Sequence, residues 1–93
     1  MVVWNAIHNE LTRAADALSF EAPVAYVYNP LVYARAMVDA YVARFGRGPR
    51  EVLLLGMNPG PWGMAQTGVP FGEASVVRDW LGLSAAIGRP VRE

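Results

Sequence analysis

The strongest constraint in this sequence is a short, uninterrupted apolar run, residues 51–55 (EVLLL), followed at once by a loop rich in glycine and proline. From Val52 to Leu55 the run shows no alternation between apolar and polar residues. A continuous aliphatic run of this kind is typical of a parallel strand that is buried on both faces of an α/β sheet. We therefore predict a central strand here, and such a strand needs neighbouring strands on both sides.

The rest of the chain offers few partners for a central strand. Only residues 24–28 (VAYVY) have a strand-like composition, and about ten residues follow the last predicted helix. We therefore expect an α/β protein with a parallel sheet that is incomplete in this chain. On this reading the 93 residues are the first part of one longer domain.

Periodicity and capping residues predict three helices. Apolar residues recur at helical spacing from Trp4 to about Leu18, which indicates the first helix. Asn29 followed by Pro30 favours a second helix that begins there, and Gly46 suits the left-handed position that ends it. The third is expected over residues 75–81. The side chains expected to pack in the core are Tyr33, Met37, Tyr41, Phe45, Trp62 and Trp80.

Composition excludes several classes of protein. The chain has no cysteine, which excludes disulfides, a thiol nucleophile and a cysteine-based zinc site. Its formal net charge is zero, so the chain has no overall positive charge that would attract nucleic acid. This weakens the case for DNA binding but does not exclude it. No apolar stretch approaches the ~20 residues of a membrane span. We expect a cytoplasmic, nucleoid-associated protein, or a nuclear one in a eukaryote, with no membrane partner. Its one histidine, His8, is interpreted as a surface residue of the first helix.

The loop at residues 56–72 (GMNPGPWGMAQTGVPFG) follows the predicted strand directly. Glycines let a backbone approach a ligand closely, and prolines stiffen the segments between them. A rigid loop at the carboxyl end of a central strand is where open α/β sheets bind ligands, and its N–H groups suit an anion such as phosphate. The loop matches neither the P-loop nor the dinucleotide-binding motif. Generic nucleotide binding and a rigid connector both stay open as alternatives.

The loop also carries a resemblance. The stretch LLLGMNPGPWGMAQTGVPFGE, with VVRDWLGL after it, closely resembles the first motif of the single-strand-selective monofunctional uracil-DNA glycosylases. Residues 28–34 (YNPLVYA) resemble the segment that precedes this motif, and the resemblance runs from about residue 9 to 83. It implies a three-layer α/β/α sandwich. The chain would then be the N-terminal part of one uracil-DNA glycosylase-like domain, with a helical lead-in (1–50) before the first strand, active-site loop and helix (51–93).

The resemblance implies an enzyme of base-excision repair that flips uracil and 5-substituted uracils out of DNA and hydrolyses the N-glycosidic bond. Asn58 matches the catalytic position, where its amide oxygen would hold the attacking water, because an amide cannot act as a base. Phe71 matches the aromatic that stacks on the base, and the backbone N–H groups of Met57 and Phe71 would meet uracil oxygens. Gly60 would leave space at the 5-position. The positions expected to shape the loop near the DNA backbone are Pro59, Pro61 and Gly63.

Uracil-containing DNA, single- or double-stranded, is the partner that the resemblance implies, with a monomeric enzyme that needs no metal and no organic cofactor. In the family a later His-Pro-Ser motif stabilises the departing base, and the 93 residues contain no such motif. We therefore expect the chain alone to be inactive and to supply the water-positioning and base-stacking half of the site. The alternative is a truncated, non-catalytic DNA- or nucleotide-binding remnant of the family.

Overall fold

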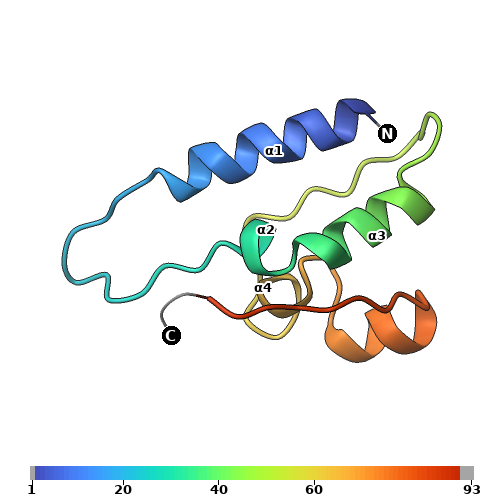
Figure 1. The fold of residues 1–93 in the computed structure, drawn as a ribbon. Coiled ribbons are helices and arrows are strands. Elements are labelled where there is room, and N and C mark those ends of the chain that lie inside the picture. The colour runs from blue at the N-terminus through green and yellow to red at the C-terminus, as the bar shows by residue number, and fades with distance from the viewer. Residues whose placement is uncertain (1, 91–93) are drawn as a thin grey trace.

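The computed structural model describes residues 2–90, and over this range the chain consists of helices joined by long irregular segments (Figure 1). None of these helices is both long and apolar enough to cross a membrane. In chain order the elements are α1 (Val2–Asp16), α2 (Pro30–Tyr33), α3 (Arg35–Phe45), α4 (Met64–Thr67) and the π-helix η1 (Val76–Trp80).

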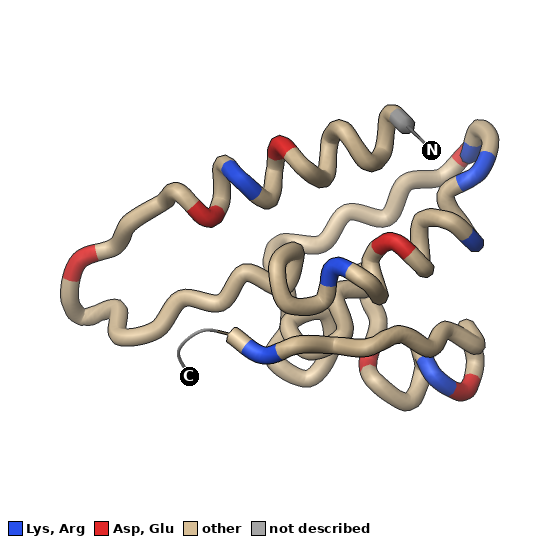
Figure 2. The backbone as a smooth tube through the Cα atoms, viewed as in Figure 1, with Lys and Arg blue, Asp and Glu red and all other residues tan. Residues whose placement is uncertain are grey.

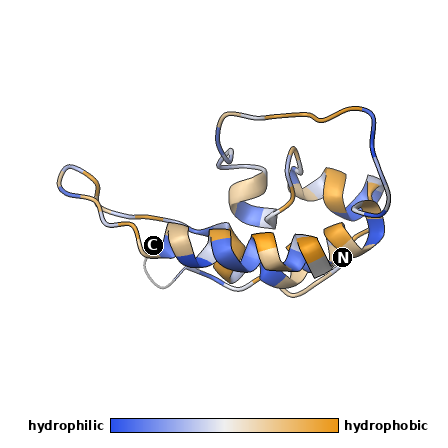
Figure 3. Ribbon diagram, turned by 90° about the horizontal axis from the view of Figure 1, so that it is seen from above, coloured by the Kyte–Doolittle hydropathy of each residue, from blue (hydrophilic) through white to orange (hydrophobic). Residues whose placement is uncertain are grey.

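No β-strand forms within residues 2–90, so the predicted α/β sandwich with its parallel sheet is wrong for this structure. The run Val52–Leu55 makes no backbone hydrogen bond to another described segment, and its side chains are 72–89% exposed. In Figure 1 this segment crosses between α1 and α3, and the view from above in Figure 3 shows it standing away from both helices. A strand exists only through hydrogen bonds to a neighbour. Residues 24–28, the other candidate, form no strand either.

The core is small and lies where α3 meets the end of the glycine- and proline-rich loop and η1. The accessible surface is 7232 Å², whereas a folded monomer of this mass exposes about 5,300 Å². The additional surface reflects extended apolar segments that no described element covers. The buried apolar residues are Ala34, Met37, Val38, Val42, Val69, Val77 and Leu83.

Helix α1 forms where periodicity predicts it, but it contributes little to the core. The apolar side chains of its predicted inner face, Trp4, Ile7 and Leu11, are about half exposed. One hydrogen bond joins α1 to the start of α2, where the Asn29 side-chain amide donates to the Thr12 carbonyl at 3.3 Å. The helix therefore lies at the edge of the molecule.

The second predicted helix starts as expected and then divides in two. Asn29 caps it, because its side-chain oxygen accepts from the Leu31 N–H at 3.2 Å, and Pro30 follows. The helix is interrupted at Ala34, whose φ and ψ are −109° and 22°, so α2 and α3 are separate. The expectation of a left-handed Gly46 is wrong, since its φ is −88° and its N–H still bonds to the Val42 carbonyl. The left-handed residue is Gly48, two positions later.

The expected burial of Trp80 and Trp62 is also wrong, because these side chains are 82% and 76% exposed. In η1 the Leu81 N–H bonds to the Val76 carbonyl, five residues back, which is the π-helical pattern. Within this helix Val77 is buried in the core, whereas Trp80 is in solvent.

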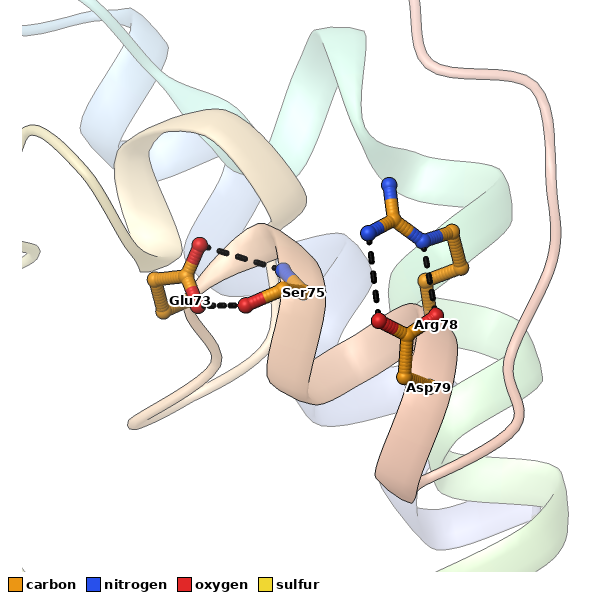
Figure 4. A network of polar contacts seen from close by, with 4 residues as sticks. All are labelled: Glu73, Ser75, Arg78 and Asp79. Carbon is orange, nitrogen blue, oxygen red and sulfur yellow. Dashed lines mark hydrogen bonds and ion pairs between the residues drawn. The ribbon is translucent and has the colours of Figure 1, made fainter.

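Figure 4 shows the polar groups around η1. Arg78 and Asp79 form an exposed two-pronged ion pair with distances of 2.8 and 3.2 Å. Glu73 accepts hydrogen bonds from the Ser75 hydroxyl and from the Ser75 N–H, the latter at 3.1 Å.

Candidate functional site

The glycine- and proline-rich loop, residues 56–72, contains a tight turn that leads into α4. The Gly60 carbonyl accepts hydrogen bonds from the Gly63 N–H at 3.3 Å and the Ala65 N–H at 3.0 Å. The Gln66 side-chain amide donates to the Pro61 carbonyl at 3.0 Å, which closes the turn from outside. Pro61 and Gly63 therefore lie in a defined turn, and Pro59 is exposed just before it.

The second half of the loop is held by the Thr67 hydroxyl, which is buried with 3% of the residue exposed. This oxygen accepts from the Val69 N–H at 3.1 Å and donates to the Gly72 carbonyl at 2.7 Å. The Gly63 carbonyl lies further away, at 3.3 Å. One side chain thus joins both ends of the turn over residues 69–72.

The loop packs directly on α3 and on the residue before it. Gly68 has a φ of 77°, and a Cβ there would lie 2.9 Å from the Ala34 Cβ and from the Val38 Cγ2. A Cβ on Gly72 would lie 2.7 Å from the Val69 Cβ. The loop takes this path only because both positions lack a side chain.

Phe71 is the residue of the loop with the most unusual backbone. Its φ is 56°, the only positive value among the non-glycine residues in the described range. Such a conformation is uncommon outside glycine and persists where neighbouring structure enforces it. The ring is 65% exposed, and its Cζ lies 3.4 Å from where a Cβ on Gly56 would stand. Phe71 is therefore not a core residue, and its exposed ring lies beside Gly56, at the other end of the loop.

Asn58 is exposed in the first part of the loop. Its Nδ2 donates to the Pro59 carbonyl at 3.2 Å, and Oδ1 makes no hydrogen bond within residues 2–90. The acceptor oxygen of this exposed residue is thus not used in a hydrogen bond within the described range. The neighbouring Met57 side chain is also exposed, and a Cβ on Gly60 would meet no atom within 4 Å.

Asn58 and Phe71 come from opposite ends of the loop at residues 56–72. Asn58 lies two residues after Gly56, and the contact between Gly56 and the Phe71 ring brings the two ends together. An open cleft of about 600 Å³ borders the turn and is lined by Tyr28, Tyr33 and Gln66 among others. Of the predicted site residues, only Pro61 borders this cleft.

From the sequence, Thr67 is expected only to hold the loop closed together with Gln66 and Gly68, and its hydroxyl is assigned no chemistry. The signal that could have found it is local. Threonine hydroxyls often bond to a backbone group two residues further on, and Gly68 next to Thr67 permits the turn that this requires.

The titratable groups near the loop are not suited to acid–base chemistry near neutral pH. Hydrogen bonds from the Ser75 hydroxyl and N–H lower the pKa of Glu73, and the bond from Arg78 lowers the pKa of Asp79. Both carboxylates are therefore ionised. Within the described range, no three histidine or acidic side chains gather as potential metal ligands.

His8 lies outside the loop, on α1. Its ring centroid is 6.1 Å from that of Trp4, and its Nδ1 is buried with no hydrogen-bond partner among the described residues. Burial, and to a smaller extent the charge of Arg35, lower the pKa of His8.

No protein-family model matches this chain. Its sequence is 58% identical over 83 residues to a rat protein, and this match covers 89% of this chain and 30% of the relative. A mouse protein matches with the same identity and the same coverages. A cattle protein is 59% identical over 76 residues, 82% of this chain and 28% of the relative. Each is named a single-strand selective monofunctional uracil-DNA glycosylase. The predicted family is confirmed for this part of the sequence. The chain spans about 30% of the length of the rat and mouse relatives.

Proposed function

We propose that residues 56–72 form part of a DNA-repair glycosylase, the part that positions the attacking water and stacks the flipped uracil. The names of the relatives support uracil-DNA glycosylase chemistry. The observation that carries the proposal is Phe71, whose backbone is left-handed and whose exposed aromatic ring lies beside Gly56. An exposed ring on a restrained backbone is a suitable surface for a base.

Asn58 is the proposed water-positioning residue. In the reaction, the water oxygen forms a bond to the sugar C1′ while the bond from C1′ to the base breaks, the electron pair leaves with the base, and the proton of the water passes to solvent. The Asn58 Oδ1 accepts a hydrogen bond from that water, since Nδ2 already donates to the Pro59 carbonyl. The amide takes up no proton near neutral pH. Its contribution is orientation of the nucleophile.

Base stacking on Phe71 supplies the binding energy for an extruded base. One base–aromatic stack contributes about 1–3 kcal/mol, which is comparable with the few kcal/mol needed to unstack a base. That cost is lowest in single-stranded DNA. Because the net charge is zero, and Figure 2 shows acidic and basic positions interspersed along the backbone, we expect DNA binding by this chain to depend weakly on salt.

Gly60 is the proposed specificity position. A Cβ added there would meet no atom within 4 Å, which supports the proposal that the position accommodates a 5-substituent of a bound base. We expect Gly60→Tyr to lower the affinity for single strands containing 5-hydroxymethyluracil while affinity for uracil is retained. Equal affinity of the variant for both oligonucleotides, as in the unsubstituted chain, would contradict this role.

Fluorescence anisotropy with the 93-residue chain tests the proposal. The probes are a single-stranded oligonucleotide with one uracil and the same strand with a tetrahydrofuran abasic site in its place. We expect tighter binding of the uracil strand than of the abasic strand. Phe71→Ala should lower this ratio of affinities about fivefold or more, because the weakest base–aromatic stack contributes about 1 kcal/mol. The matched control is Phe20→Ala, an exposed phenylalanine outside the loop. Equal affinity of the unsubstituted chain for both strands would refute the proposal.

A further inference from the structure

We infer that Thr67 is a positioning residue for Phe71, because its buried hydroxyl holds the ring in the orientation that presents it to a base. The effect on the base rests on the proposed function, whereas the effect on the ring can be measured without any ligand.

Three hydrogen bonds enclose Phe71. The Thr67 hydroxyl bonds to the Val69 N–H at 3.1 Å and to the Gly72 carbonyl at 2.7 Å, and the Gly72 N–H bonds to the Val69 carbonyl at 3.0 Å. Phe71 lies inside this closed arrangement, one residue from its carboxyl end, with a φ of 56°. The Thr67 hydroxyl therefore restrains the backbone on both sides of the residue whose conformation is unfavourable.

The arrangement is anchored to the core. Val69 is fully buried, and Gly68 lies so close to Ala34 and Val38 that no Cβ would fit. Motion of the turn as a rigid unit is thus restricted, and the direction of the Phe71 ring follows from the backbone angles that the Thr67 hydroxyl maintains. The result is the contact between the ring and Gly56.

The Thr67 hydroxyl contributes hydrogen bonds to the turn and is not needed to fill the volume of the core. Thr67 is the one buried polar residue among those described, and a valine would fill the same volume. Thr67→Val would leave the Val69 N–H and the Gly72 carbonyl without their partner, and buried backbone groups without partners are unfavourable. The turn would relax toward a conformation in which Phe71 has a negative φ.

The test compares Thr67→Val with Thr67→Ser, which keeps the hydroxyl. The first measurement is the NMR nuclear Overhauser effect between the Phe71 ring protons and the Gly56 α-protons. We expect it in the unsubstituted chain and in Thr67→Ser, and we expect its loss in Thr67→Val. Thr67→Ala, which leaves room for a water molecule, serves as the second variant should Thr67→Val not fold. Persistence of the Overhauser effect in the variants that lack the hydroxyl would overturn the inference.

The second measurement is the preference for the uracil strand over the abasic strand. We expect Thr67→Val to reduce this preference about fivefold, which corresponds to the smallest contribution of one base–aromatic stack, about 1 kcal/mol. Thr67→Ser should retain the preference. In the Phe71→Ala background, Thr67→Val should have no further effect, because the threonine acts through the ring. Equal reductions with and without the Phe71 ring would overturn a positioning role. Failure of the unsubstituted chain to prefer uracil would refute the proposed function, and the Overhauser comparison would still decide the role of Thr67.

Discussion

Substitution by alanine of Gly48, which precedes the loop, and of the loop residues Gly60, Gly68 and Gly72 separates two reasons why a position requires glycine. A Cβ is unfavourable where φ is positive, and it is unfavourable where it collides with a neighbour. Gly48 has a φ of 69° with no atom within 4 Å of a Cβ, whereas Gly72 has no positive φ but would place a Cβ 2.7 Å from the Val69 Cβ. Gly68 combines both conditions, and Gly60 has neither.

The expected magnitudes follow from this arrangement. The left-handed conformation costs alanine about 1–2 kcal/mol, and insertion of a methyl group into a packed site costs about 1–3 kcal/mol. Against these stands a gain of about 0.4–1 kcal/mol, because alanine lowers the entropy of the unfolded chain. The free energy of unfolding should therefore fall by about 1 kcal/mol for Gly48→Ala, about 1–2 kcal/mol for Gly72→Ala and about 2–4 kcal/mol for Gly68→Ala. Gly60→Ala should leave it unchanged or raise it.

Urea denaturation at constant pH, followed by far-UV circular dichroism, measures the four differences in free energy. The m-value serves as a control, since an unchanged m-value shows that the variants unfold over the same surface. The reasoning is refuted if Gly68→Ala is as stable as Gly60→Ala, because the loop would then neither turn left-handed nor pack against Ala34 and Val38. A neutral Gly72→Ala together with a destabilised Gly48→Ala would refute only the packing of the turn.

Other predictions follow from the core and from α1. Leu54→Asp should change the free energy of unfolding by less than about 0.5 kcal/mol, because its side chain is exposed, whereas Val77→Ala in the core should lower it by about 1–3 kcal/mol. Urea denaturation measures both, and strong destabilisation by Leu54→Asp would show that the apolar run is covered. Because the folded chain lowers the pKa of His8, the unfolded chain takes up the proton first as the pH falls. Stability should therefore decrease below the ordinary histidine pKa of 6.5, and His8→Gln should flatten that decrease in urea titrations between pH 7.5 and 5.5.

Local features of the sequence predicted the helix starts. Asn29 caps α2 and Pro30 follows it, because a cap needs only a side-chain oxygen and an N–H two residues away. The periodic spacing from Trp4 onward likewise predicted α1. The loop motif, seventeen residues of unusual composition, indicated the resemblance to the uracil-DNA glycosylases, which the relatives confirm. The site roles of Asn58 and Phe71 remain proposals.

The features that the sequence alone could not decide are those that depend on distant partners. Val52–Leu55 has the composition of a central strand, yet a strand requires hydrogen bonds from another segment, and the described chain provides none. Trp80 has the composition of a core residue, yet η1 packs on the core through Val77 and leaves Trp80 exposed. Thr67 stands next to a glycine in a turn-like stretch, which indicates a role in closing the loop, but only the folded structure places its hydroxyl between the Val69 N–H and the Gly72 carbonyl. Features that depend on neighbouring residues, such as helix caps, can thus be predicted from the sequence. The pairing of strands and the burial and orientation of side chains depend on which segments meet in three dimensions.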